Sequence, residues 1–106
     1  MMSSDDEPCP PPPVLEGALV REMQIVNRKG LHARATAKFV QCVERFSSKI
    51  RVTRCGETVG GDSIMGILTL GAGLGSTISV AALGDDAETA LEAIATLVAN
   101  RFGEDE

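Results

Sequence analysis

The hydrophobic spacing of this chain switches repeatedly between the two-residue period of strands and the three-to-four-residue period of helices. Residues 19–26 are typical of a strand, and Gly30 interrupts it. Residues 33–46 then follow the spacing of an amphipathic helix. The apolar positions are Leu19, Met23 and Ile25 on the strand, and Ala33, Ala37, Phe39, Val40, Val43 and Phe46 on the helix. A chain that changes period in this way is expected to mix both kinds of element in one fold.

The same alternation continues to the end of the sequence. Further strands are predicted at residues 49–53, 58–59 and 77–82, with a turn at Cys55-Gly56-Glu57 between the first two, and further helices at 64–68 and 87–98. Asp62 and Ser63 both suit the N-cap of the first of these helices, and Asp85 with Glu88 suits the start of the second. Four short strands and three helices predict an α+β domain with a mostly antiparallel sheet that the helices cover on one side.

The length of the chain limits it to one small domain. It has 106 residues, and all five of its prolines lie within residues 8–13, behind an acidic start. We therefore expect residues 1–17 to form a disordered, acidic and proline-rich extension, and residues 18–106 to form the folded domain. The sequence contains neither the pattern of a signal peptide nor an apolar run of about 18 residues, so a cytoplasmic protein without membrane insertion is expected.

The cysteines argue for free thiols. Cys9, Cys42 and Cys55 form no CxxC pair and are odd in number, which fits reduced thiols better than a disulfide framework. A metal site built from Cys42, Cys55 and His32 would lack a fourth ligand and has no recognised spacing. We expect neither a metal nor a cofactor.

The overall charge is acidic but unevenly distributed. A formal net charge of -5, with no Trp or Tyr to stack on bases, argues against a nucleic-acid binder. Between Met23 and Val43 there is no acidic residue, whereas Arg28, Lys29, Arg34 and Lys38 are all basic. This basic segment suits a phosphate group or an acidic partner, although a solvated basic face would look the same.

His32 is the only histidine of the chain, and it lies within this basic segment at the predicted start of a helix, in the sequence NRKGLHARATA. The backbone N–H groups of a first helical turn have no partners within the helix, and they favour negative charge in front of them. The same field disfavours an imidazolium, so a neutral and nucleophilic ring is expected. A phosphoryl group taken up by this ring could be stabilised by the helix start and by the guanidinium of Arg34.

Two other roles for His32 have to be weighed. A hydrolase would need a nucleophile and an orienting carboxylate beside the histidine, and no nucleophile-elbow pattern such as GxSxG is present. A plain helix cap would need only the position that His32 already occupies. The residue pattern alone leaves the helix cap and the phosphoryl acceptor open.

The segments GLHARATAKFV and DSIMGILTLGAG, some thirty residues apart, resemble the two signature blocks of the histidine-containing phosphocarrier proteins (HPr) of the bacterial phosphotransferase system, including the nitrogen-related branch. The resemblance covers about residues 19–102 and implies an open-faced β-sandwich. It implies that His32 is the phosphorylated histidine and Arg34 the arginine that assists the phosphate. It also implies that Ser63 is a serine that a dedicated kinase phosphorylates in some members, and that Ile64 and Met65 belong to an apolar patch where partners dock.

The chain departs from the family pattern at three places. Ala35 stands where most members have proline, which restores a backbone N–H at the helix start. Asp62 stands before Ser63 where a basic residue is usual. The proline-rich extension lies outside the resemblance.

The resemblance implies a phosphoryl relay rather than a turnover enzyme. The chain would accept a phosphoryl group on His32 from enzyme I and pass it to a histidine of an A-type enzyme II domain, with HPr kinase/phosphorylase as a further partner acting on Ser63. We expect it to be a monomer. The alternative is a regulatory binding module that Ser63 phosphorylation controls and in which His32 is vestigial.

Overall fold

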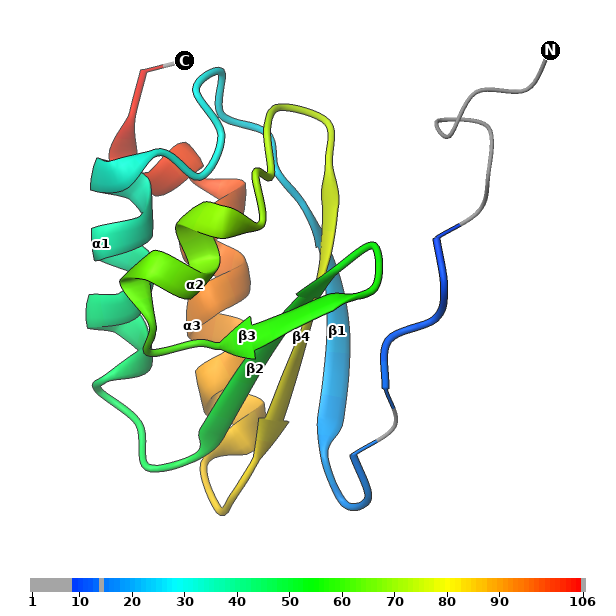
Figure 1. The fold of residues 1–106 in the computed structure, drawn as a ribbon. Coiled ribbons are helices and arrows are strands. Elements are labelled where there is room, and N and C mark those ends of the chain that lie inside the picture. The colour runs from blue at the N-terminus through cyan, green and yellow to red at the C-terminus, as the bar shows by residue number, and fades with distance from the viewer. Residues whose placement is uncertain (1–8, 14, 106) are drawn as a thin grey trace, which may run out of the picture.

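A computed structural model of the chain describes residues 9–13 and 15–105. The remaining part of the expected N-terminal extension, residues 1–8 and 14, lies outside the described residues. Figure 1 shows one sheet with helices on one of its faces, and the N-terminal segment on the other side of the sheet.

The sheet has four antiparallel strands in the order β1-β4-β2-β3. The strands are β1 (Leu19–Gln24), β2 (Lys49–Arg54), β3 (Glu57–Gly60) and β4 (Thr77–Leu83). Strand β4 lies in the middle because it pairs with β1 through Met23 and Ile78 and with β2 through Val52 and Val80. Strand β4 thereby joins β1 and β2, which both precede it in the sequence, into one sheet.

In the described part of the chain, three α-helices and one short 3-10 turn complete the fold. They are α1 (Ala33–Val43), α2 (Ile64–Thr69), α3 (Ala87–Ala99) and η2 (Arg101–Gly103). The helices cover one face of the sheet (Figure 1), which confirms the predicted α+β class, the open-faced β-sandwich and the order of elements. The turn η2 was not predicted, and it proves important for the site.

The core lies between the sheet and the helices. Ile25, Phe39, Val52, Ile78, Val80 and Ile94 have no exposed surface. On α1 the buried positions are Ala35, Thr36, Phe39, Val40, Cys42 and Val43, so the helix is rotated relative to the predicted face. Ala33 is exposed and Ala37 only half-buried, because the side of α1 that carries Ala35, Thr36 and Phe39 is the one turned to the core.

The predicted turn between β2 and β3 is a two-residue hairpin loop. Cys55 and Gly56 both have positive φ, at 49° and 90°. Two residues of positive φ give the strands the twist that a tight hairpin needs, and Asn, Asp or Gly are the usual choices there. Cysteine at the first of these positions is therefore unusual.

The start of α3 differs from the predicted one. Asp86 rather than Asp85 occupies the N-cap position, and its side chain makes no cap hydrogen bond. Its carboxylate accepts hydrogen bonds from the backbone N–H groups of Ser47 and Ser48, at 2.9 and 3.0 Å, and from the Ser48 hydroxyl. These hydrogen bonds, with the Ser48 hydroxyl first, hold the pKa of Asp86 below its ordinary value. The carboxylate thus ties α3 to the loop between α1 and β2.

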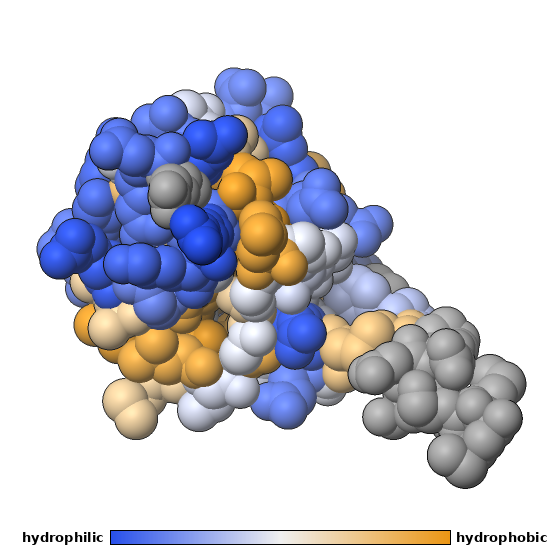
Figure 2. Space-filling model, turned by 90° about the horizontal axis from the view of Figure 1, so that it is seen from above, coloured by the Kyte–Doolittle hydropathy of each residue, from blue (hydrophilic) through white to orange (hydrophobic). Residues whose placement is uncertain are grey.

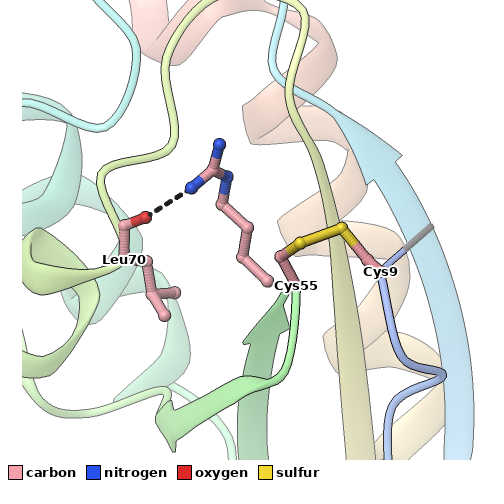
Figure 3. Close-up of a disulfide and its surroundings, with 4 residues drawn as sticks. Cys9, Cys55 and Leu70 are labelled. Atoms are coloured by element: carbon pink, nitrogen blue, oxygen red, sulfur yellow. Dashed lines mark hydrogen bonds between the residues drawn. A yellow bond between two sulfur atoms is a disulfide. The ribbon is translucent and has the colours of Figure 1, made fainter. Parts of the chain in front are cut away.

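The prediction of three reduced thiols is wrong for two of them. Cys9 and Cys55 form a disulfide with their Cα atoms 4.6 Å apart (Figure 3). The odd count misled the prediction, since the third cysteine, Cys42, is buried and free. The pairing depends on the hairpin loop being brought against the N-terminal segment, and cysteines 46 positions apart in the sequence carry no local sign of that contact.

Within residues 9–13 and 15–105, no helix is long and apolar enough to cross a membrane. The same part of the chain holds no cluster of three or more His, Cys, Asp or Glu side chains that could bind a metal ion.

Candidate functional site

His32 occupies the N-cap position of α1. Its backbone is extended, with φ −75° and ψ −179°, and its carbonyl accepts the first helical hydrogen bond from Thr36 N at 2.9 Å. The ring lies back over the helix start, where Nδ1 accepts a hydrogen bond of 3.3 Å from the backbone N–H of Arg34. The predicted position of His32 at a helix N-terminus is therefore correct, and Nδ1 is the ring atom that accepts the hydrogen bond from the helix start.

Gly30 fixes the approach of the chain to this position. It has a φ of +66°, and a Cβ atom there would lie 2.5 Å from the carbonyl oxygen of Ala72. The next residue, Leu31, donates its N–H to that same oxygen at 2.8 Å. Only glycine allows this close contact, so the segment before His32 is held against the loop that follows α2.

The other ring nitrogen of His32 contacts the end of the chain. Nε2 lies 2.5 Å from Oε2 of Glu104, which is 72 residues further along the sequence. Figure 1 shows the C-terminal segment beside the start of α1. The imidazole and the carboxylate are largely shielded, with 28% and 17% of their side-chain surface exposed. Glu104 was not among the predicted site residues.

These two contacts define the tautomer of the ring. A backbone N–H can only donate, so Nδ1 carries the lone pair. An ionised carboxylate can only accept, so Nε2 carries the hydrogen and donates it to Glu104. The hydrogen bond from His32 is the main cause that holds the pKa of Glu104 below its ordinary value, with a smaller contribution from Asn27. The nitrogen that carries the lone pair is therefore the one that faces the helix start.

Asn27 connects Glu104 to the loop before His32. Its side chain is fully buried, and Nδ2 donates to the carbonyl of Gly30 at 2.8 Å and to Oε1 of Glu104 at 3.1 Å. One amide group thus holds both the turn that positions the histidine and the carboxylate that orients its ring.

A left-handed turn brings Glu104 to the histidine. Arg101, Phe102 and Gly103 all have positive φ, at 56°, 55° and 79°. The Phe102 ring is buried, with 1% of the residue exposed, and its carbonyl accepts a hydrogen bond of 2.6 Å from Nζ of Lys38. Positive φ is costly for side chains other than glycine, and it persists only where the surroundings enforce it. The buried ring and the Lys38 ammonium provide that constraint.

The predicted basic segment divides into two parts. Arg28, Lys29 and Arg34 line a shallow cleft of about 550 Å³ together with His32, Ala33, Glu104 and Asp105. Lys38 instead supports the C-terminal turn through Phe102. Figure 2, viewed from above Figure 1, shows hydrophilic surface gathered at this end of the molecule and hydrophobic surface directly beside it.

The remaining predicted residues lie on the short helix α2, outside the cleft. Ser63 is the N-cap of α2, and its Oγ accepts a hydrogen bond of 3.0 Å from the backbone N–H of Gly66. Ile64 and Met65 are exposed, at 44% and 71%, as a docking surface requires. Asp62, the other candidate cap, does not take the cap position.

Local patterns could not have identified Glu104 and Asn27. The acidic end of the chain, Glu104 to Glu106, looks like a solvated tail, and Asn27 looks like an ordinary turn residue before a glycine. The one signal was the apolar Phe102 just before that tail, because a buried aromatic residue fixes its neighbours in space.

Fold and site together define a small α+β protein with one histidine at a helix N-terminus, with cationic side chains around it and a carboxylate behind it. Residues 19–100 match the family described as the PTS HPr component phosphorylation site. The chain belongs to the HPr family of phosphocarrier proteins of the phosphotransferase system. The predicted family and phosphocarrier function are thereby confirmed, and the regulatory binding module is not favoured.

Individual relatives agree with this assignment. The phosphocarrier protein HPr of Cupriavidus necator is 46% identical over 88 residues, which cover 83% of this chain and 99% of that protein. The solved structure of HPr-C-His from Thermoanaerobacter tengcongensis has a TM-score of 0.80 at 41% identity, covering 83% of this chain and 99% of the other. The multiphosphoryl transfer protein of Haemophilus influenzae is 41% identical over 93 residues, which cover 85% of this chain and 19% of that larger protein.

Proposed function

We propose that Nδ1 of His32 accepts a phosphoryl group from enzyme I of the phosphotransferase system, and that the chain then passes this group to a histidine on an A-type enzyme II domain. The observation that carries the proposal is the arrangement around the ring. Nδ1 holds its lone pair in front of the α1 N-terminus, while Nε2 donates to Glu104.

In the acceptance step the Nδ1 lone pair attacks phosphorus, and the bond between phosphorus and the donor breaks with its electron pair remaining on the donor. Nε2 keeps its hydrogen, so positive charge develops on the ring. The Glu104 carboxylate, 2.5 Å from Nε2, stabilises that charge without taking part in bond making. Glu104 is thus a positioning residue that fixes the tautomer and balances the charge of the imidazole.

The oxygens of the transferred group meet donors from the start of α1. The N–H groups of Ala33, Arg34 and Ala35 precede the first helical hydrogen bond, which Thr36 donates to the carbonyl of His32. The helix start therefore offers the N–H groups of Ala33 and Ala35 to an anion, the Arg34 N–H already lies at Nδ1, and the Arg34 side chain in the same cleft adds a guanidinium. Ala35 contributes an N–H that proline at this position would lack.

Partner recognition is proposed to use two surfaces. The cleft with Arg28, Lys29 and Arg34 attracts acidic side chains of a partner, and the exposed Ile64 and Met65 supply an apolar contact. The same residues would contact enzyme I and the enzyme II domain in turn, as a relay requires. The similarity to part of a multiphosphoryl transfer protein supports partners of the phosphotransferase system.

Several further features belong to this proposal. The phosphocarrier acts as a protein substrate at each step rather than as a turnover enzyme. It is proposed to work as a monomer in the cytoplasm, with residues 18–106 as its phosphocarrier domain. Ser63 is proposed as a site for HPr kinase/phosphorylase. Its hydroxyl lies at a helix start that tolerates added negative charge.

The deciding experiment is incubation of the full chain with phosphoenolpyruvate and enzyme I, followed by intact-mass measurement before and after acid treatment. We expect one phosphoryl group that acid removes, because phosphohistidine is acid-labile and phosphoserine is not. The variant His32→Ala should remain folded by circular dichroism, at a cost of about 1 kcal/mol for the lost cap, and should take up no acid-labile phosphate. Undiminished acid-labile labelling of that variant would contradict the assignment of His32.

A further inference from the structure

The disulfide between Cys9 and Cys55 joins the family domain to a segment outside it. Cys55 lies within residues 19–100, which match the family, whereas Cys9 precedes them. The bond is therefore an addition to the phosphocarrier fold, and its role has to be sought in what it holds in place.

The disulfide holds residues 9–13 against the face of the sheet that the helices leave open (Figure 1). Pro10 packs over the hairpin loop, where a Cβ atom on Gly56 would lie 3.1 Å from its Cγ. A cleft of about 290 Å³ then separates Pro12, Pro13 and Leu15 from the outer side chains of the sheet. Those side chains are Val20, Arg51, Thr53, Thr58, Ser79 and Ala81.

The covalent bond is the main tether of this segment. Residues 10–13 are all proline and carry no backbone N–H, so they cannot donate hydrogen bonds to the sheet. A proline-rich terminal segment is expected to detach from a domain unless something ties it down. Opening the disulfide should therefore release the segment and uncover the outer face of the sheet.

The position of Cys55 also suits a reactive bond. It is exposed at the tip of the β2–β3 hairpin, with the positive φ of 49° that only a few residue types adopt easily. Cys9 is exposed as well. Exposed disulfides are the ones that exchange readily with external thiols, whereas structural disulfides resist reduction.

We propose that Cys9–Cys55 is a redox-active disulfide that a protein dithiol of the CxxC class opens, and that its state decides whether residues 9–13 cover the outer face of the sheet. One thiolate of the reductant attacks a sulfur of the bond and forms a mixed disulfide, and its second thiolate then resolves it. Two electrons and two protons pass to this chain, giving free Cys9 and Cys55, and the reductant is left as a disulfide. The inference goes beyond the phosphoryl relay and does not rest on it.

The first test measures the bond itself. The full chain, purified without reductant, is treated under native conditions with reduced thioredoxin and then with iodoacetamide, and the alkylated residues are identified by mass spectrometry. We expect alkylation of Cys9 and Cys55 only after thioredoxin treatment. Cys42 serves as an internal control, because burial raises the pKa of its thiol and keeps it unreactive in the folded protein.

The second test measures the segment. Amide spectra of ¹⁵N-labelled protein are compared for the oxidised chain, the reduced chain, and the variants Cys9→Ser and Cys55→Ser. Reduction and both variants should shift the resonances of Thr53, Ser79 and Ala81 in the same way and sharpen those of residues 15–17, while residues of α3 stay unchanged.

Three results would overturn the proposal: free Cys9 and Cys55 in the protein purified without reductant, a bond that thioredoxin opens only after denaturation, or outer-face resonances that do not respond to reduction. Phosphorylation of His32 is assayed separately on both redox forms. A failure of the relay and a failure of this inference are therefore distinguishable.

Discussion

Oε2 of Glu104 lies 2.5 Å from Nε2 of His32, although the two residues are 72 positions apart in the sequence. The contact places a carboxylate behind the ring, on the side opposite to the nitrogen that faces α1. It exists because three consecutive residues of positive φ turn the chain back after α3 and because the buried Phe102 anchors that turn. The segment after α3 thus contributes Glu104 to the site.

Replacing Glu104 by glutamine should slow phosphorylation of His32 several-fold. Glutamine keeps the size of the side chain but can donate as well as accept, so it neither fixes the Nε2–H tautomer nor stabilises the charge that develops on the ring. Single-turnover phosphorylation by enzyme I measures the rate. The ¹⁵N chemical shifts of the imidazole report the tautomer directly, and they should change toward a mixture.

Asp105→Asn is the matched control for this variant. Asp105 lines the same cleft, so its replacement removes one negative charge there while leaving the Glu104 contact with His32 in place. If both variants slow transfer equally and neither changes the ring ¹⁵N shifts, then Glu104 acts only through the overall charge of the cleft.

Replacing Arg34 by alanine should slow transfer about tenfold without changing which residue is labelled, because an exposed guanidinium stabilises the phosphoryl oxygens but is not the nucleophile. The backbone N–H of Arg34, which binds Nδ1 of His32, is retained in this variant. Transfer rates to and from the carrier are measured with enzyme I and with an enzyme II domain. Arg45→Ala is the control, since Arg45 lies beyond the other end of α1, 5.5 Å above the Phe46 ring. Equal rates for Arg34→Ala and wild type would leave Arg34 as a surface cation.

Replacing Ser63 by aspartate should keep the fold but weaken association with enzyme I. Aspartate is also a good N-cap and can accept the hydrogen bond from Gly66, so α2 should persist. Its charge next to Ile64 and Met65 disfavours an apolar contact and repels an acidic partner. The initial rate of His32 phosphorylation, measured against carrier concentration, should reach the same maximum at higher concentration.

Ser63→Ala separates the charge from the loss of the hydroxyl. It costs about 1 kcal/mol of stability through the lost cap but adds no charge, so its concentration curve should match wild type. A Ser63→Asp curve that also matches wild type would show that Ser63 is an ordinary helix cap.

Replacing Asp86 by asparagine should destabilise the protein at neutral pH and lose that effect in acid. The pKa of Asp86 is lowered in the folded state, so its contribution is complete above the ordinary pKa of about 3.9 and disappears as the pH falls through the lowered value. Asparagine also replaces one carboxylate oxygen with an NH₂ group, which cannot accept the hydrogen bonds that the Ser47 and Ser48 N–H groups donate to Asp86. Urea unfolding at pH 7, 5 and 3 should therefore show a difference from wild type that shrinks only at the lowest pH.

Asp85→Asn provides the comparison for this prediction. Asp85 is the exposed neighbour of Asp86, outside the cluster with Ser47 and Ser48, and its replacement should change the free energy of unfolding little at any of these pH values. A difference for Asp86→Asn that stays constant down to pH 3 would exclude the ionised carboxylate as its cause.

The sequence by itself determined the elements and the place of the histidine. Strand and helix periods are properties of neighbouring residues, so the order of four strands and three helices could be predicted without knowing their packing. The same holds for His32, because Gly30 and the helix that begins at Ala33 define a helix start locally. The rotation of α1 was missed because Ala33 and Ala37, near the start of the helix, have the same four-residue spacing as the buried pair Ala35 and Phe39.

Only the tertiary structure decided which distant residues meet. The contacts of His32 with Glu104, Lys38 with Phe102, Asp86 with Ser48 and Cys9 with Cys55 join residues 72, 64, 38 and 46 positions apart. No periodicity records such contacts, since they depend on how the helices pack on the sheet and where the left-handed turn after α3 points. The sequence therefore supplied the histidine and the helix start that it caps. Packing supplied the carboxylate that contacts the imidazole and the disulfide that holds the N-terminal segment, because both need segments that only the folded sheet brings together.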